Sequence, residues 1–217
     1  MYLNQDRLEE ILIPDAIKEF IDAADKGEID IMHQMLLRGI DPDSRGIKGW
    51  TALRRGTVKG HFDVAEKLLN HGAKVDATNA TNHTALHMAC AYGHAEIADL
   101  LLRFGANPHL VTINGYTTLM HAARYGHSPL VKMMIDLHVS IDHQCNEGKT
   151  ALMLAAGFGY EEIIHMLLNS GANPDIVDKS GHFTGDTALS IARNGNHQSI
   201  VEILEAATKC GSNQASK

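Results

Sequence analysis

The chain has 217 residues, of which 44% are hydrophobic, and its formal net charge is −7 at pH 7. This negative charge argues against nucleic acid as a partner, because binding nucleic acid requires basic side chains that neutralise phosphates. No apolar run approaches the roughly 18 residues that a membrane-spanning helix needs, and no basic-then-apolar leader is present, so we expect neither a membrane span nor a secretory signal peptide.

The three cysteines, Cys90, Cys145 and Cys210, lie in unrelated sequence contexts. A disulfide framework would need an even and patterned set of cysteines. We therefore expect a reducing, cytoplasmic compartment.

Residues 1–13 are predicted to form a short amphipathic segment, in which Leu8, Ile11 and Leu12 are among the apolar positions. The residues that follow form the repeats described below, and this segment would cover the apolar face of the first of them. The terminal units of a repeat protein must avoid exposing that face. The alternative is that it docks a partner.

The chain then repeats itself with a period of 33 residues. Thr51, Thr84, Thr117 and Thr150 are each 33 residues apart and open the same short phrase, and Thr187 follows after 37 residues. A fixed period of this length indicates a solenoid of stacked repeats. The predicted repeat boundaries are about 14–46, 47–79, 80–112, 113–145, 146–178 and 179–208, and residues 209–217 are predicted to be a polar C-terminal tail.

Each repeat predicts two short helices joined by a tight turn. The opening threonine can cap the first helix with its hydroxyl, and a Gly-His turn such as Gly93-His94 follows that helix. Apolar residues at helical spacing, such as Ile97, Leu100 and Leu101, then mark the second helix. Glycines are expected to end the second helix because they adopt left-handed backbone angles at little cost.

Two positions depart from this pattern. His138 stands where the other repeats have a helix-ending glycine. A left-handed histidine should cost about 1 kcal/mol, so we expect either an altered helix end in the fourth repeat or a weaker link in the stack. Four extra residues around Phe183 predict a longer loop that reaches a ligand, the alternative being a neutral insertion.

The repeated phrase, read as TALHMACAYGHAEIADLLLRFGANPH over residues 84–109, resembles the ankyrin repeat family. The resemblance implies an all-α, ankyrin-repeat solenoid of stacked helix-turn-helix units with β-turn fingers. It extends over about six repeats, of which the first and last would be capping units.

The sequence offers little that points to catalysis or metal binding. Of the 14 histidines, four occupy the turn position of the repeat, and the resemblance implies that His87 hydrogen-bonds between neighbouring repeats. No nucleophile elbow, phosphate-binding loop, HExxH or CxxC motif is present. We expect no catalytic residues, no metal and no cofactor; the competing hypothesis is a metal-binding or enzymatic protein that uses the neighbourhood of His83, His87 and His121.

The resemblance places the binding face on the finger tips and on the exposed side of each first helix. Three sets of repeat positions fall there: the residue before each opening threonine, the residue before each Gly-His turn, and the residue after the opening four-residue phrase. Aromatic residues gather in the first two sets, and such residues are favoured at protein interfaces. The candidate partner-binding residues are Trp50, Arg54, Arg55, Lys59, His83, Tyr92, Tyr116, Arg124, Tyr125, Lys149, Phe158 and Phe183.

Two structural alternatives apply to these candidates. Tyr92, Tyr125 and Phe158 occupy one position in three consecutive repeats, so they form either a partner-facing stripe or packing contacts between repeats. Arg54 and Arg55 would bind acidic groups of a partner with bidentate hydrogen bonds, or would pair with acidic residues of the first repeat, such as Asp22 or Asp25.

The resemblance implies a non-catalytic module that binds a protein partner on its concave face and acts as a scaffold, adaptor or inhibitor. We expect a monomer that binds neither nucleic acid nor membranes. An alternative biological role is that of a bacterial effector delivered into a host cell, where it would bind a host protein.

Overall fold

The computed structural model describes residues 14–179 and 185–214, with side chains described as far as Thr208. The amphipathic segment predicted at residues 1–13 and Phe183 of the predicted long finger lie outside the described residues. The chain divides into two compact units, Met1–Asn107 and Pro108–Lys217. The described residues contain α-helices, one 3-10 helix and no strand, so the predicted all-α fold is confirmed.

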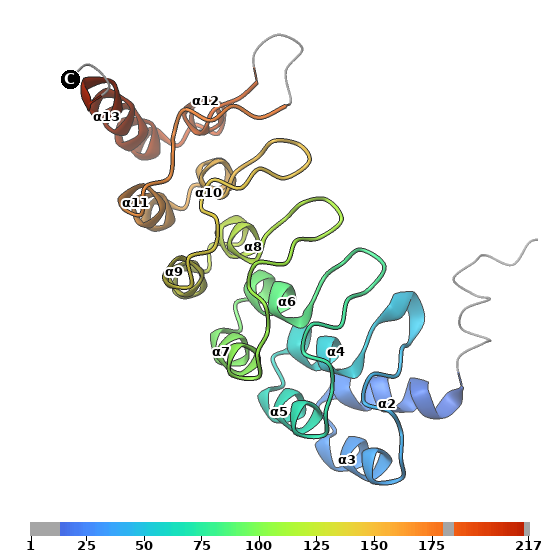
Figure 1. The fold of residues 1–217 in the computed structure, drawn as a ribbon. Coiled ribbons are helices and arrows are strands. Elements are labelled where there is room, and N and C mark those ends of the chain that lie inside the picture. Colours follow the sequence, from blue (N-terminus) through green and yellow to red (C-terminus); the bar gives the residue numbers. More distant parts are fainter. Residues whose placement is uncertain (1–13, 180–184, 215–217) are drawn as a thin grey trace, which may run out of the picture. The chain divides into compact units, whose positions relative to one another are not determined.

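From residue 14 onward, where the structure describes it, the first unit contains three helix pairs (Figure 1). One row consists of the first helix of each pair, and a second row consists of the second helices; neighbouring helices pack along each row. The bounds are α2 Asp15–Lys26, α3 Ile29–Leu37, η1 Ile47–Gly49, α4 Ala52–Lys59, α5 Phe62–Asn70, α6 Ala85–Tyr92 and α7 Ala95–Arg103.

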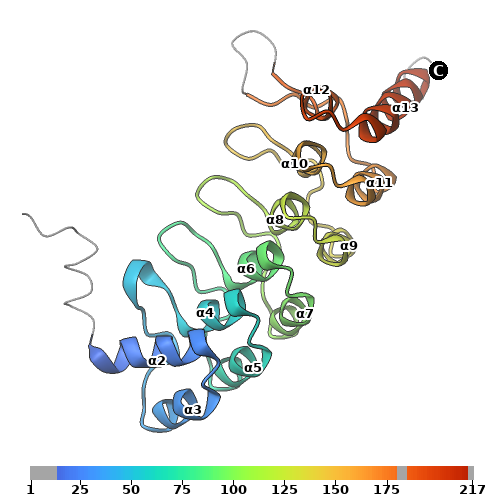
Figure 2. The same cartoon turned by 180° about the vertical axis from the view of Figure 1, so that it is seen from behind.

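The second unit repeats this arrangement. Helices α8, α10 and α12 pack along one row, while α9, α11 and α13 form the other. In the first unit, finger-like loops lead from α3 to α4 and from α5 to α6, and in the second unit one leads from α9 to α10; these loops project on the side of the first row, as the view from behind also shows (Figure 2). The bounds are α8 Thr118–Arg124, α9 Ser128–Asp136, α10 Ala151–Phe158, α11 Glu161–Asn169, α12 Ala188–Asn194 and α13 Gln198–Gln214.

Threonine caps fix where five of the first helices begin. In each case the threonine has extended backbone angles, and its hydroxyl oxygen accepts the backbone N–H of the third following residue at 3.1–3.4 Å. This bond satisfies one of the free donors of the first helical turn, so the predicted caps are confirmed. The five caps are Thr51, Thr84, Thr117, Thr150 and Thr187.

The turn between the two helices of a repeat holds the next repeat in place. Gly60 has a left-handed φ of 78°, and the ring of His94 from the following repeat lies against its Cα. The Nε2 atom of His94 is 3.2 Å from the carbonyl oxygen of Val58, a hydrogen-bonding distance. Equivalent contacts join His61 to Asp25 at 3.1 Å and His197 to Gly157 at 3.3 Å.

These contacts give His61, His94 and His197 structural roles within their units. The pattern tolerates one substitution, because Tyr160 takes the histidine position in the fifth repeat and its ring lies against Gly126.

His138 does not alter the end of α9. It keeps the left-handed angle at φ 56°, as the glycines at this position do. The backbone bonds that end the helix are also kept: His138 donates to Ile135, as Gly105 donates to Leu102, both at 2.9 Å. The predicted change of helix geometry is therefore wrong, whereas the weaker link in the stack stays a prediction.

The last helix is longer than the predicted repeat. Helix α13 continues to Gln214, so the start of the polar region predicted as a tail, from residue 209, is helical. Each residue added to an existing helix gains a backbone hydrogen bond at low cost. Polar composition alone did not end this helix.

Candidate functional site

Trp50, Arg54 and Arg55 form one compact group in the first unit, which we call the Trp50 cluster. Trp50 ends the finger between α3 and α4, just before the cap Thr51, and the two arginines lie in the first turn of α4. The guanidinium carbons of Arg54 and Arg55 are 4.1 Å and 4.5 Å from the centroid of the Trp50 ring. Cations at such distances are attracted to the electron-rich face of an indole ring.

Arg54 is buried, contrary to its predicted role as a surface residue that binds acidic groups of a partner. Only 1% of its surface is exposed, and its Nε and Nη1 atoms have no hydrogen-bond partner. The reason is its place in the repeat, since the residue 33 positions later, His87, is also fully buried. Burial lowers the pKa of Arg54 from its ordinary value to about 10, and the nearby charges of Arg55 and Arg45 add to this effect.

Arg55 and Lys59 point away from the core and share one carboxylate of the first repeat. Arg55 lies 3.5 Å from Asp25, and Lys59 lies 3.7 Å from the other oxygen of the same side chain. The alternative that Arg55 pairs with the first repeat is thus confirmed. Both basic side chains remain substantially exposed, at 38% and 48%. Because exposed ion pairs are weak, Arg55 and Lys59 can also bind an acidic group of a partner.

His83, the equivalent of Trp50 in the next finger, is half-buried. Its Nδ1 atom is 2.8 Å from the Thr81 hydroxyl, and its ring meets that of His87 edge-on with centroids 6.0 Å apart. Burial and the charge of Arg54 lower the pKa of His83, while a hydrogen bond to the Thr81 backbone acts in the opposite direction. His83 therefore resists protonation in the folded protein.

This lowered pKa predicts a loss of stability in acid. Above the ordinary value of 6.5, His83 is neutral in the folded and unfolded states and contributes nothing to pH dependence. As the pH falls below that value, the unfolded chain binds a proton that the folded chain resists, so the free energy of unfolding decreases. We expect His83→Gln to lose less stability than the wild type between about pH 7.5 and pH 5, measured by urea unfolding; equal losses would contradict the prediction.

A second group, the Tyr116 cluster, consists of Tyr116, Arg124 and Tyr125 in the second unit. The guanidinium carbon of Arg124 is 5.9 Å from the ring centroid of Tyr116 and 5.7 Å from that of Tyr125. Arg124 also donates to the Tyr116 hydroxyl at 3.5 Å. Burial raises the pKa of Tyr116, so this phenol stays protonated near neutral pH and can act as a hydrogen-bond donor.

His121 and Lys149 border this cluster. His121 was not among the predicted binding residues, yet its ring centroid is 5.6 Å from that of Tyr116. Lys149, a predicted residue, pairs with Glu147 at 2.9 Å. The hydrogen bond to Glu147 raises the pKa of Lys149, so its charge is retained.

The aromatic residues before the helix turns are about half exposed: 53% for Tyr92, 49% for Tyr125 and 53% for Phe158. Part of each remaining ring surface is used locally. Tyr92 stacks on His94 with centroids 6.5 Å apart, and Phe158 stacks on Tyr160 at 6.2 Å. These contacts lie within the turn of the same repeat, and about half of each residue's surface remains exposed.

The third set of predicted positions, after the opening phrase, is mostly buried. Met88, His121 and Leu154 are each less than a tenth exposed, while Arg55 and Ile191 are partly exposed. Because most of these side chains are buried, the candidate face reduces to the finger residues and the ends of the first helices.

Sequence reasoning missed the neighbours of Trp50. Ile21 from α2 and Ile47 from the finger line a pocket beside Trp50 and Arg55. These residues lie 26 positions apart, outside the 33-residue register, so repeat analysis gave no reason to join them. The apolar Ile47 within a polar finger was the available signal.

Across residues 14–179 and 185–208, no group of three or more histidine, cysteine or acidic side chains is arranged to hold a metal ion. None of the described helices is both long and apolar enough to cross a bilayer. The arrangement instead presents aromatic rings, cations and hydrogen-bond donors on the finger side of the first helices, chemistry suited to recognising another macromolecule.

Comparison with known families identifies the repeat. The family model "Ankyrin repeats (3 copies)" matches residues 20–112 and 99–178. No curated protein matches the chain. Ankyrin repeats generally serve as protein–protein interaction modules and are typically non-catalytic. With matched residues covering most of the sequence and capped helix pairs in register, the chain belongs to the ankyrin repeat family.

Proposed function

We propose that this protein is a non-catalytic module that binds a protein partner through the fingers and the exposed ends of its first helices. The observation that supports this most directly is the half-exposed aromatic residue at one repeat position, in Tyr92, Tyr125 and Phe158. The exposed half of each ring brings no stability through burial, whereas at an interface it would bury much area with little loss of entropy.

The cations beside these rings support the same proposal. Arg124 lies between two tyrosines in the second unit, and Arg55 lies on Trp50 in the first. Aromatic residues and arginine are the side chains most enriched where binding energy concentrates in protein interfaces. A partner that covers either group would desolvate an aromatic ring and a cation together.

The test is affinity capture from a cytosolic extract with the wild type and with the Tyr92→Ala, Tyr125→Ala, Phe158→Ala triple variant. Because each ring is already half exposed, we expect a small change in melting temperature and a loss of captured protein of at least about tenfold. A large drop in melting temperature would mean instead that the rings serve packing.

A matched control removes apolar area from the other row of helices. Leu37, Phe104 and Leu137 are 71%, 40% and 37% exposed, at or just after the ends of the second helices. Replacing these three by alanine should leave capture unchanged. If both triple variants capture the same proteins as the wild type, the binding face lies elsewhere and the proposal is wrong.

A further inference from the structure

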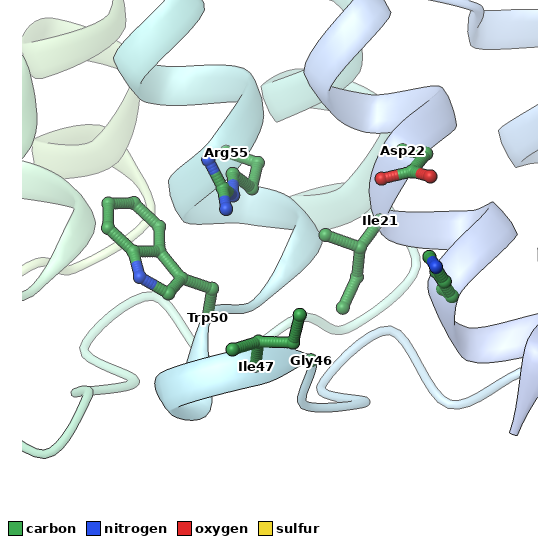
Figure 3. Close-up of a pocket in the computed structure, with 7 residues that line it drawn as sticks. Ile21, Asp22, Gly46, Ile47, Trp50 and Arg55 are labelled. Atoms are coloured by element: carbon green, nitrogen blue, oxygen red, sulfur yellow. The ribbon is translucent and has the colours of Figure 1, made fainter. Parts of the chain in front are cut away.

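The Trp50 cluster borders a small pocket in the first unit. Figure 3 shows Ile21 and Asp22 coming from α2 and Arg55 from α4, with Ile21 directed toward Ile47 and Trp50 of the intervening finger. The pocket thus has an apolar side, made by two isoleucines and an indole, and a charged rim. We call it the Trp50 pocket.

The size of the pocket limits what it can hold. Its volume is about 70 Å³, well below the roughly 300–1,000 Å³ of typical cofactor and drug-sized sites. A single apolar side chain fits this space better than a small molecule does. The lining favours the same occupant, because isoleucine and tryptophan side chains gain by excluding water from an apolar group.

The charges around the pocket are unusual for this chain. From Arg45 to Lys59 every charged residue is basic, although the chain as a whole carries a net charge of −7. Lys18 and Arg55 lie on the rim, with Asp22 as the acidic residue among the lining side chains. Asp25 serves both Arg55 and Lys59, so one carboxylate offsets two cations.

Arg54 adds a buried positive charge behind Trp50. Its guanidinium lies 4.1 Å from the ring centroid, and no acidic group or other acceptor contacts its Nε or Nη1 atoms. The charges that act on it most strongly are those of Arg55 and Arg45, which repel it. A charge held in a low-dielectric interior acts over a longer range than one in water, so the wall of the pocket is electropositive.

We propose that the Trp50 pocket binds an acidic segment of the partner protein. One apolar or aromatic side chain of the segment enters the pocket against Trp50, and a neighbouring carboxylate pairs with Lys18 or Arg55. This inference rests on the proposed protein-binding function and names the chemistry of the partner. The same cations would repel a basic segment. A nucleic acid is also a poor fit, because an apolar pocket for one side chain makes no favourable contact with a phosphate backbone.

Trp50 provides a direct readout because it is the chain's single tryptophan. The full-length protein is titrated with pools of short, capped, tryptophan-free peptides while the indole fluorescence is recorded. One pool combines Asp and Glu with Leu and Phe, a second combines Asp and Glu with Ser and Gly, and a third combines Lys and Arg with Leu and Phe. A single-stranded oligodeoxynucleotide is the fourth probe.

The acidic–apolar pool is expected to produce a saturable change in fluorescence at concentrations up to about 1 mM, and added salt should weaken the binding. The other three probes should bind at least about tenfold more weakly. The proposal is overturned if the basic pool or the oligonucleotide binds as well as the acidic–apolar pool, or if no probe gives a saturable change.

Charge-neutralised variants locate the site. Lys18→Gln and Arg55→Gln are expected to weaken acidic–apolar binding about threefold to tenfold each. The control Arg103→Gln removes the same charge from α7 of the same unit, where Arg103 pairs with Asp99, and should leave the affinity unchanged. Equal affinities for the wild type and the Lys18→Gln, Arg55→Gln double variant would overturn the proposal.

Failure of this inference can be told apart from failure of the proposed function. Suppose that protein capture depends on Tyr92, Tyr125 and Phe158 but that no peptide changes the Trp50 fluorescence. The acidic-segment inference is then wrong, and the proposed function stands. Suppose instead that peptides bind at Trp50 but that both triple variants capture the same proteins as the wild type. The proposed aromatic binding face is then wrong, while the inference about the Trp50 pocket stands.

Discussion

Replacing Arg54 by methionine is expected to raise the free energy of unfolding by about 1–2 kcal/mol. The guanidinium is 1% exposed and lacks partners for two of its nitrogen atoms. Its pKa falls from its ordinary value to about 10, a shift that corresponds to roughly 3 kcal/mol of destabilisation of the charged form at neutral pH. Loss of the contact with Trp50 offsets about 0.5–2 kcal/mol of the gain.

Methionine is the natural choice for this test because the same repeat position already holds it elsewhere. Met120 and Met153 occupy the position in the second unit and are 1% and 2% exposed. Chemical unfolding of Arg54→Met measures the effect, and the reverse change, Met120→Arg, should cost about 3–5 kcal/mol by burying an unpaired charge. A destabilised Arg54→Met protein would show that stacking on Trp50 outweighs the cost of burial.

A stabilising substitution at Arg54 would also bear on function. Proteins commonly retain locally unfavourable groups where binding needs them, and stabilising replacements at such places tend to lower function. If Arg54 makes the Trp50 pocket electropositive, Arg54→Met should be more stable and should bind the acidic–apolar peptides more weakly. The two effects then have one cause, the buried charge.

The fold could be predicted from the sequence because its signals are local and periodic. Thr84 opens α6 through a bond to a backbone N–H three residues away, and Gly93 and His94 mark the turn at the end of that helix. Interactions of this kind fall inside one repeat or between equivalent positions of adjacent repeats, so the 33-residue register reveals them.

The site could be predicted only in part. The register located Trp50 and the exposed aromatic positions, yet Arg54 was assigned to the surface because its chemistry suggested a contact with acidic groups. Comparison with the buried position of His87 would have placed it inward. The pocket could not be foreseen, because Ile21 and Ile47 come together only through the packing of α2 against the finger.

His138 illustrates a different limit. The glycine rule predicted a disturbed helix end, but the backbone keeps φ at 56° with a histidine in place. The cost of about 1 kcal/mol for a left-handed residue other than glycine is small beside the total packing energy of a helix pair. The helix end therefore keeps its shape, and a cost in stability at His138 stays a prediction.

Glycines in the turn between the two helices of a repeat lie against a side chain of the next repeat, whereas the glycines that end the second helices do not. Replacing a turn glycine by alanine should therefore cost more stability than replacing a helix-ending glycine. A Cβ atom on Gly60 would lie 2.7 Å from Cε1 of His94, while one on Gly105 would meet no atom within 4 Å. Both residues have left-handed backbones, at φ 78° and 86°. Gly105→Ala should therefore cost about 1 kcal/mol through backbone strain alone.

Gly60→Ala is expected to cost about 2–3 kcal/mol, because the methyl group must displace the His94 ring and weaken its bond to Val58 as well as strain the backbone. Urea unfolding of the two alanine variants measures the difference. Hydrogen exchange should show lost protection at the junction of the second and third repeats in Gly60→Ala, since each repeat is stabilised through its neighbours.

A double-mutant cycle separates the contact from the strain. His94→Ala removes the ring with which the new methyl group collides, so Gly60→Ala should cost about 1 kcal/mol in that background, close to its cost at Gly105. If the two substitutions were additive, the His94 ring would play no part in the effect and the turn glycine would serve backbone geometry alone. A strong coupling would instead assign the turn histidine the role of joining one repeat to the next.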